Sequence, residues 1–113
     1  MINITKGLRA EESVREYFLR KSFVLIRNRW KTPYAELDLV FLNPLKTRFC
    51  IVEVKTNGSS ETLDYRLSAG QRLRIQRASL WLRFTYHKDV DVYLALVKPD
   101  SQIVLVNFED FHL

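Results

Sequence analysis

Two short apolar segments carry charged residues where a buried strand would normally carry none, and this feature constrains the fold most. The first segment has Glu36 and Asp38 two positions apart, and the second has Glu53 and Lys55 with the same spacing. In a strand, residues two apart lie on one face. Charges at the end of a mostly buried strand are costly unless they are paired or bound to a metal ion. The pattern therefore predicts two sheet strands whose charged ends have a defined partner.

The apolar residues of the two segments predict the opposite face of each strand, which takes Leu37, Leu39, Phe41, Cys50, Val52 and Val54. If the strands are neighbours, Asp38 and Glu53 converge. Two converging carboxylates suit Mg²⁺, which keeps several waters as its remaining ligands. The simpler alternative is an ion pair between Lys55 and an acidic side chain at the edge of the sheet.

The remaining apolar periodicity predicts a mixed α/β fold. Ala10, Val14, Tyr17 and Phe18 follow the spacing of one buried helical stripe. The expected elements are a helix over 7–21, a strand over 23–26, a loop over 27–34, strands over 36–42 and 49–55, a helix over 68–86, and strands over 90–97 and 103–106. The order α-β-β-β-α-β-β predicts a central mixed sheet flanked by helices. The strand that follows the second helix is expected to pair in parallel with an earlier one.

Composition limits the class of protein. The chain has 113 residues, which fits a single domain over residues 1–113, and its net charge is +5. A basic balance favours an anionic partner, most commonly nucleic acid. The single cysteine excludes an internal disulfide and agrees with the reducing cytoplasm. We expect neither a signal peptide nor a membrane-spanning segment.

The two predicted helices supply further candidates. Glu11 flanks the buried stripe of the first helix, so it is the best third carboxylate if that helix crosses the end of the sheet; otherwise it is a solvated edge residue. Gln71 begins the face of the second helix that packs on the sheet, although an amide near a helix start needs no function. A second apolar stripe on that helix is formed by Leu73, Leu80 and Phe84.

In sequence order, the segments Glu36-Leu37-Asp38-Leu39-Val40 and Val52-Glu53-Val54-Lys55-Thr56 resemble the core motif of the PD-(D/E)XK nucleases. Nearly the whole chain resembles the YraN-like family of predicted endonucleases, which is related to archaeal Holliday-junction resolvases. The supporting motifs are Gly7 with Glu11, Arg27-Asn28, Gln71-Arg72 and Leu80-Trp81-Leu82. The chain departs from the family pattern at Ala35, where the family has Gly, and at Gly70, where it has Lys.

The resemblance implies a restriction-endonuclease-like fold and a Mg²⁺- or Mn²⁺-dependent endonuclease acting on DNA, with branched DNA as a candidate substrate. The implied metal ligands are Asp38 and Glu53, with Glu11 and Glu36 in support. Lys55 would position or activate the attacking water, and Gln71 would orient a phosphate or water.

Basic residues predict a surface for nucleic acid, made of Arg27, Arg29, Trp30, Lys31, Arg72 and Arg74. Cations there would contact phosphates, and the indole of Trp30 would stack on a base or sugar. The alternative is an ordinary solvated loop with Trp30 packed on the domain. Two other functions stay open. One is a non-catalytic nucleic-acid-binding module with the same fold, and the other is a partner-binding subunit that uses the second helix. A homodimer is compatible with all three.

Overall fold

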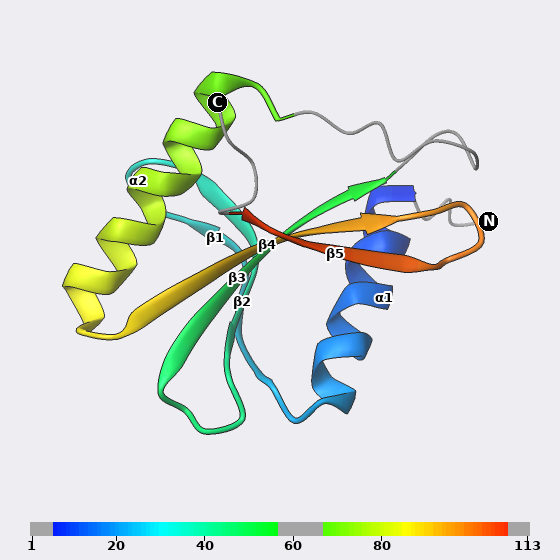
Figure 1. Cartoon of the computed structure of the whole chain (residues 1–113), viewed down its shortest axis with the longest axis horizontal. Coiled ribbons are helices and arrows are strands. Elements are labelled where there is room, and N and C mark those ends of the chain that lie inside the picture. The colour runs from blue at the N-terminus through cyan, green and yellow to red at the C-terminus, as the bar shows by residue number, and fades with distance from the viewer. Residues whose placement is uncertain (1–5, 57–66, 109–113) are drawn as a thin grey trace.

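The computed structural model describes residues 6–56 and 67–108, and its elements follow the predicted order (Figure 1). The helices and strands are α1 (Lys6–Arg20), β1 (Val24–Lys31), β2 (Glu36–Leu42), β3 (Arg48–Thr56), α2 (Ala69–Tyr86), β4 (Asp89–Val97) and β5 (Ile103–Asn107). Neither helix is long and apolar enough to cross a membrane.

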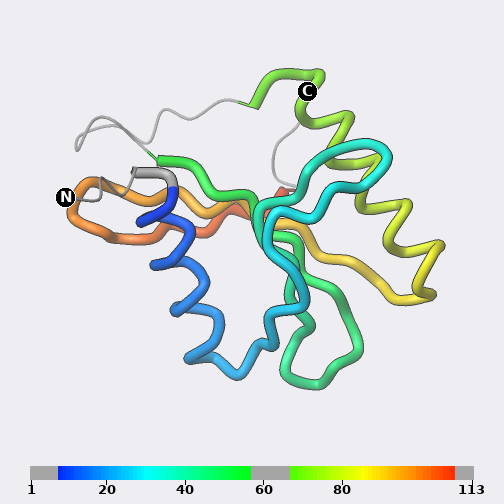
Figure 2. Tube along the Cα trace, turned by 180° about the vertical axis from the view of Figure 1, so that it is seen from behind, coloured from blue at the N-terminus to red at the C-terminus, as the bar shows by residue number. Residues whose placement is uncertain are grey.

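The strands form one sheet in the order β1-β2-β3-β4-β5. Neighbouring strands are antiparallel, except that β3 and β4 are parallel, which confirms the predicted mixed sheet. The parallel pair requires a crossover, and α2 supplies it. The two helices lie on opposite faces of the sheet (Figures 1 and 2). The middle strand, β3, is therefore covered by one helix on each face.

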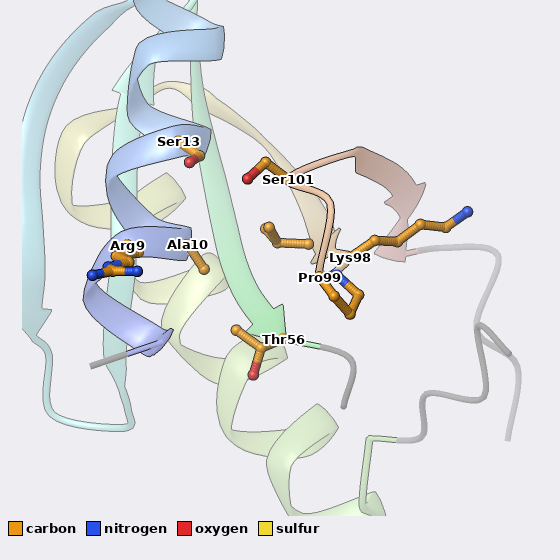
Figure 3. Close-up of a pocket in the computed structure, with 8 residues that line it drawn as sticks. Arg9, Ala10, Ser13, Thr56, Lys98, Pro99 and Ser101 are labelled. Carbon is orange, nitrogen blue, oxygen red and sulfur yellow. The ribbon is translucent and has the colours of Figure 1, made fainter. Parts of the chain in front are cut away.

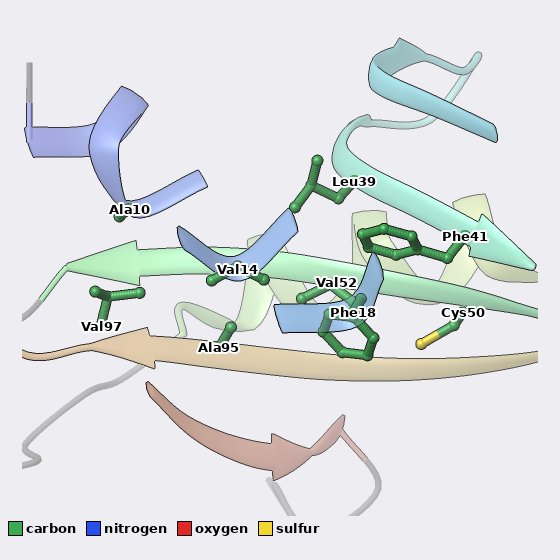
Figure 4. Packing of buried hydrophobic residues seen from close by; sticks show 9 residues of the cluster. All are labelled: Ala10, Val14, Phe18, Leu39, Phe41, Cys50, Val52, Ala95 and Val97. Carbon is green, nitrogen blue, oxygen red and sulfur yellow. The ribbon is translucent and has the colours of Figure 1, made fainter. Parts of the chain in front are cut away.

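The face of the sheet under α1 is packed by the predicted helical stripe. Ala10, Val14 and Phe18 are buried against the strands, as Figure 4 shows. The ring of Phe18 stacks on that of Phe41, with centroids 4.9 Å apart. Because these residues recur at intervals of four, one side of α1 faces the sheet along its length. This packing holds β2 and β3 in place from below.

The opposite face is covered by α2, which buries Ile75, Ala78 and Leu82. Ser68 caps this helix: its hydroxyl accepts from the backbone N–H of Gln71 at 3.1 Å. In return, the side-chain oxygen of Gln71 accepts from the backbone N–H of Ser68 at 3.2 Å. This reciprocal capping box satisfies N–H groups that a helix start otherwise leaves unpaired. It also fixes the first turn of α2 beside the end of β3.

The loop expected over residues 27–34 is wrong, because β1 continues through Lys31. Trp30 pairs with Leu37 and Lys31 pairs with Glu36, so the hairpin is longer than predicted. The turn is confined to the four residues 32–35, where the hydroxyl of Thr32 donates to the carbonyl of Ala35 at 2.6 Å. Basic residues and a nearby proline suggested a loop, whereas cross-strand pairing and the burial of Trp30 stabilise a strand.

The predicted face of Leu37 is also wrong. Leu39 packs under α1, but Leu37 packs with Val40 in the cluster under α2. The change of face coincides with Arg29, which lies between Asn28 and Trp30, the partners of Leu39 and Leu37, and has a φ of 50°. A left-handed backbone is unusual for a non-glycine residue and re-aims the side chains around it. Simple alternation along the strand could not reveal this bend.

Candidate functional site

The strands β2 and β3 separate where their charged residues begin. Their ladder ends at the pair Leu39 and Val52, and Asp38 and Glu53 are the next residue on each strand. The backbone N–H of Val54 donates to Oδ2 of Asp38 at 2.8 Å. The backbone N–H of Asp38 lies 3.4 Å from Oε1 of Glu53, a longer and weaker contact. Each carboxylate thus accepts a hydrogen bond from the opposite strand, and these side chains take the place of the ladder hydrogen bonds. We call this site, formed by Asp38 and Glu53, the fork.

Burial makes this fork electrostatically unusual. Glu53 is only 7% exposed and is the one buried charged side chain among the described residues. This burial, and then the charge of Asp38 and the hydrogen bonding with it, raises the pKa of Glu53 to about 9. The backbone N–H of Asp38 and the charge of Lys55 oppose that rise with smaller effects. Two adjacent carboxylates, one of them desolvated, favour either a proton or a cation between them.

Lys55 follows Glu53 on the same strand and lines a pocket of about 190 Å³ between β3 and the start of α2. The pocket also contains the side chains of Glu36, Glu53, Gln71 and Arg74. The fold therefore gathers at one hollow four of the predicted catalytic and metal-binding residues and Arg74 of the predicted basic surface. Gln71 reaches it from the capping box, so its amide has the structural role that the sequence analysis left open.

Glu11 lies elsewhere. Its carboxylate contacts Arg29 at 3.3 Å, in a hollow on the α1 side that Leu39 also lines. Within residues 6–56 and 67–108, no three Asp, Glu, His or Cys side chains lie close enough to hold a metal ion together. The structure thus brings Asp38 and Glu53 together, whereas neither Glu11 nor Glu36 completes a set of three with them. Supporting metal roles for Glu11 and Glu36 stay predictions.

The family to which the chain belongs is shown by a match to a family model. Residues 10–98 match the model of the uncharacterised protein family UPF0102. The chain belongs to this family. A UPF0102 protein of Prochlorococcus marinus (strain MIT 9303) is 36% identical over 114 residues, covering 93% of this chain and 88% of that protein. A UPF0102 protein of Rhodopseudomonas palustris (strain BisA53) is 32% identical over 100 residues, covering 84% and 75%.

Solved structures show the fold of this UPF0102 chain. Hjc from Archaeoglobus fulgidus, a Holliday junction resolvase, superposes with a TM-score of 0.68 at 19% identity, covering 96% of this chain and 78% of that one. A repair endonuclease from Pyrococcus abyssi gives a TM-score of 0.56 at 10% identity, covering 89% of this chain and 42% of that one. The predicted restriction-endonuclease-like fold is therefore confirmed. The predicted family is confirmed as well, since UPF0102 and YraN are the same family.

The basic surface of this UPF0102 chain differs from the prediction at one residue. Trp30 is buried, packs edge-to-face on Trp81 with centroids 6.2 Å apart, and has Arg27 over its ring. It cannot stack on a base without leaving the core, so that predicted role is wrong. Arg27, Arg29, Lys31 and Arg74 are exposed, and Arg72 is half-buried. Their contacts with phosphate stay a prediction.

Sequence reasoning missed two local features, one at the start of α2 and one on β1. The Ser68-Ala69-Gly70-Gln71 segment is a capping-box pattern, because a serine precedes a glutamine by three residues at a helix start. That signal was available in the sequence. The left-handed Arg29 had no comparable signal, since arginine does not favour this backbone conformation.

Proposed function

We propose that this protein hydrolyses phosphodiester bonds of DNA with the help of a divalent metal ion. The observation that carries the proposal is the fork itself, where a buried Glu53 and the carboxylate of Asp38 lie together, with Lys55 two residues beyond Glu53. Carboxylates are kept this close inside proteins chiefly where function requires them. The names of the two similar structures, a Holliday junction resolvase and a repair endonuclease, support the same chemistry and a DNA substrate.

Asp38 and Glu53 would hold the metal ion. Carboxylate oxygens are hard ligands, and Mg²⁺ or Mn²⁺ takes one or two of them and keeps waters in its other positions. The raised pKa of Glu53 supports this assignment, because a nearby cation would offset the repulsion from Asp38. When bound, the ion supplies a water of lowered pKa and an electrophile for the phosphate oxygens.

The remaining residues act around that centre. Lys55 would orient the attacking water or stabilise charge that develops on the phosphate. Glu36 lines the same pocket and would accept hydrogen bonds from metal-bound waters. Gln71 uses its side-chain oxygen in the helix cap, which leaves the amide N–H₂ group to donate to a phosphate or water.

DNA would reach this pocket across a basic surface. Arg27, Arg29 and Lys31 lie on β1, and Arg72 and Arg74 lie on the first turns of α2. These cations would contact phosphates without reading the base sequence. We infer affinity that falls steeply with salt.

A nuclease assay tests the proposal. Linear and branched DNA are incubated with the protein and Mg²⁺ or Mn²⁺, next to the variants Asp38→Asn and Lys55→Ala. We expect cleavage by the wild type alone, and none with EDTA. Equal cleavage by the variants would assign the activity to a contaminant.

A second function is favoured by the position of Glu11. Among residues 6–56 and 67–108, its pairing with Arg29 leaves Asp38 and Glu53 as the only carboxylates at the fork, which suits a module that binds nucleic acid without cutting it. Salt-sensitive DNA binding, no heat of metal binding in calorimetry and no cleavage would support this alternative over the nuclease.

A further inference from the structure

The turn between β1 and β2 and the second half of α2 enclose a groove with exposed aromatic side chains. Its volume is about 600 Å³, and its lining residues are Tyr34, Arg77, Leu80, Trp81, Phe84 and Thr85. Phe84 is 71% exposed and Tyr34 is 45% exposed. Exposed apolar side chains that cluster in one groove are candidates for a binding surface, whereas single exposed ones are ordinary. We call these six residues the aromatic groove.

The aromatic groove begins next to the pocket lined by Glu36, Glu53 and Lys55, which we call the acidic pocket. Tyr34 immediately precedes Ala35, and Arg77 lies one helical turn beyond Arg74; Ala35 and Arg74 both line the pocket of Glu53 and Lys55. The β1–β2 hairpin runs alongside α2 in both views (Figures 1 and 2). A ligand lying along α2 would therefore pass from the acidic pocket into the aromatic groove.

Charge indicates the kind of ligand. The helix α2 has no acidic residue, and its cations are Arg72, Arg74, Arg77 and Arg83. A second copy of this helix packed on the groove would bring arginines against arginines, which is unfavourable. A polyanion would be attracted along the whole helix. A ligand that combines repeated negative charge with flat apolar rings matches both features of the surface.

We propose that the aromatic groove binds unpaired bases of single-stranded DNA next to the acidic pocket. Bases would stack on Tyr34 and Phe84, and Arg77 would contact the phosphates between them. Aromatic side chains on a basic groove bind single strands in this way, because every base has a π face. A duplex offers no such face, since its bases are already stacked. The inference deepens the proposed function, on which it rests, by naming substrates with a single-stranded portion.

Another hollow on the molecule lacks these features. It lies between α1 and the β4–β5 turn, and Figure 3 shows Ser13 and Ser101 on its two sides. The charged ends of Arg9 and Lys98 point away from it in the same view. The two cations do not converge on that hollow, so the aromatic groove is the stronger candidate.

Binding in EDTA tests the inference without any cleavage. The anisotropy of a labelled oligo(dT) strand is measured with Asp38→Asn protein, in parallel with a duplex of the same length. We expect Tyr34→Ala and Phe84→Ala, each introduced into that background, to weaken binding of the single strand by about 5- to 100-fold. Binding of the duplex should change less than twofold. Quenching of tryptophan fluorescence by the single strand, through Trp81 in the groove, is the second readout.

Matched variants separate stacking on an aromatic ring from non-specific hydrophobic binding. Phe84→Leu keeps apolar surface but removes the ring, so it should weaken binding as Phe84→Ala does. Phe84→Trp keeps an aromatic ring and should bind the single strand as the wild type does. Leu45 is 81% exposed in the β2–β3 turn, outside the groove. Leu45→Ala should leave binding unchanged. Wild-type affinity in Phe84→Leu would overturn the inference.

The outcome is distinguishable from failure of the proposed function. If the wild type cuts DNA with Mg²⁺ but Phe84→Ala and Tyr34→Ala bind oligo(dT) normally, the groove inference fails and the nuclease stands. If Phe84 governs binding of the single strand and nothing is cut, the nuclease fails and the groove stands. A wild-type dimer that Phe84→Ala converts to a monomer, with unchanged DNA binding, would show that the groove is a protein interface and would overturn the inference.

Discussion

Two acidic clusters lie towards opposite ends of β3, and they differ in how their charge is satisfied. Towards the start of the strand, Arg48 donates to both oxygens of Asp91, at 2.8 and 2.9 Å, and to Asp89 at 3.2 Å. Arg83 adds a longer contact to Asp89, at 3.6 Å. All these side chains are about 40–60% exposed. This cluster is a partly solvated ion-pair network of the kind that any sheet can carry.

At the other end, Asp38 and Glu53 accept hydrogen bonds from backbone N–H groups, and burial, followed by repulsion from Asp38, raises the pKa of Glu53. A cluster built for stability would resemble the first one, with a guanidinium on each carboxylate. The fork instead keeps a buried carboxyl group next to another, which costs stability in the absence of a ligand. The difference assigns a structural role to the first cluster and supports a functional role for the second.

The largest expected effect is loss of cleavage when the fork is changed. Asp38→Asn keeps an oxygen that can accept from Val54 but removes the charge, so we expect cleavage to fall at least about 100-fold. Asp91→Asn, the matched change in the other cluster, should keep cleavage within about twofold. A nuclease assay with both variants at equal concentration checks this. Similar losses in both would remove the contrast between the clusters.

The stabilisation of the protein by Mg²⁺ should depend on the fork and not on the ion-pair network of Arg48. Mg²⁺ at 100 times its dissociation constant would stabilise the native wild-type protein by about 2.7 kcal/mol. This gain should vanish in Glu53→Gln and persist in Asp89→Asn. Thermal unfolding with Mg²⁺ or EDTA provides the measurement. Stabilisation that survives Glu53→Gln would place the ion elsewhere.

The raised pKa of Glu53 predicts a pH dependence of stability without metal. The pKa rises on folding from 4.5 to about 9, so the folded state binds a proton more tightly than the unfolded state. The contribution of Glu53 to stability is therefore complete below about pH 4.5 and is lost as pH rises towards about 9. Glu53→Gln cannot lose that proton, and its side-chain oxygen can still accept from Asp38.

In EDTA at pH 8, Glu53→Gln should consequently be more stable than the wild type, by on the order of 1–3 kcal/mol. The difference should shrink towards pH 4.5. Urea unfolding across this range measures it. A variant less stable than the wild type at pH 8 would show that the carboxylate is satisfied in the native protein.

Much of the fold, and the residues of the fork, could be predicted from the sequence because both rest on the periodicity of apolar and charged residues. Alternation placed Glu53 and Lys55 together on β3, and the interval of four residues identified Val14 and Phe18 as core. The second strand was correct in its bounds, since apolar residues with β propensity run from Glu36 to Leu42 and Asn43-Pro44 ends them.

The rest depended on tertiary contacts that one sequence does not display. The extension of β1 follows from pairing with β2 and from the fit of Trp30 against α2, and the change of face at Leu37 coincides with the left-handed backbone of Arg29 on the paired strand. The partner of Arg48 lies 43 residues away on β4, and no local pattern links the two positions. The fork could be expected from motifs, but its electrostatics depend on the burial of Glu53, which only the three-dimensional structure shows.

The smallest expected effect belongs to the network at the start of β3. Arg48→Met removes the guanidinium shared by Asp89 and Asp91 but keeps the aliphatic stem that covers the sheet. Because the pair is partly exposed, we expect the melting temperature to fall by only about 2–5 °C, and the difference to narrow in 1 M salt. Cleavage should be unchanged, since the network lies far from the fork along β3. Loss of cleavage in a variant that still melts near the wild-type temperature would mean that the two clusters communicate, and that the division between a structural and a functional end of β3 is too sharp.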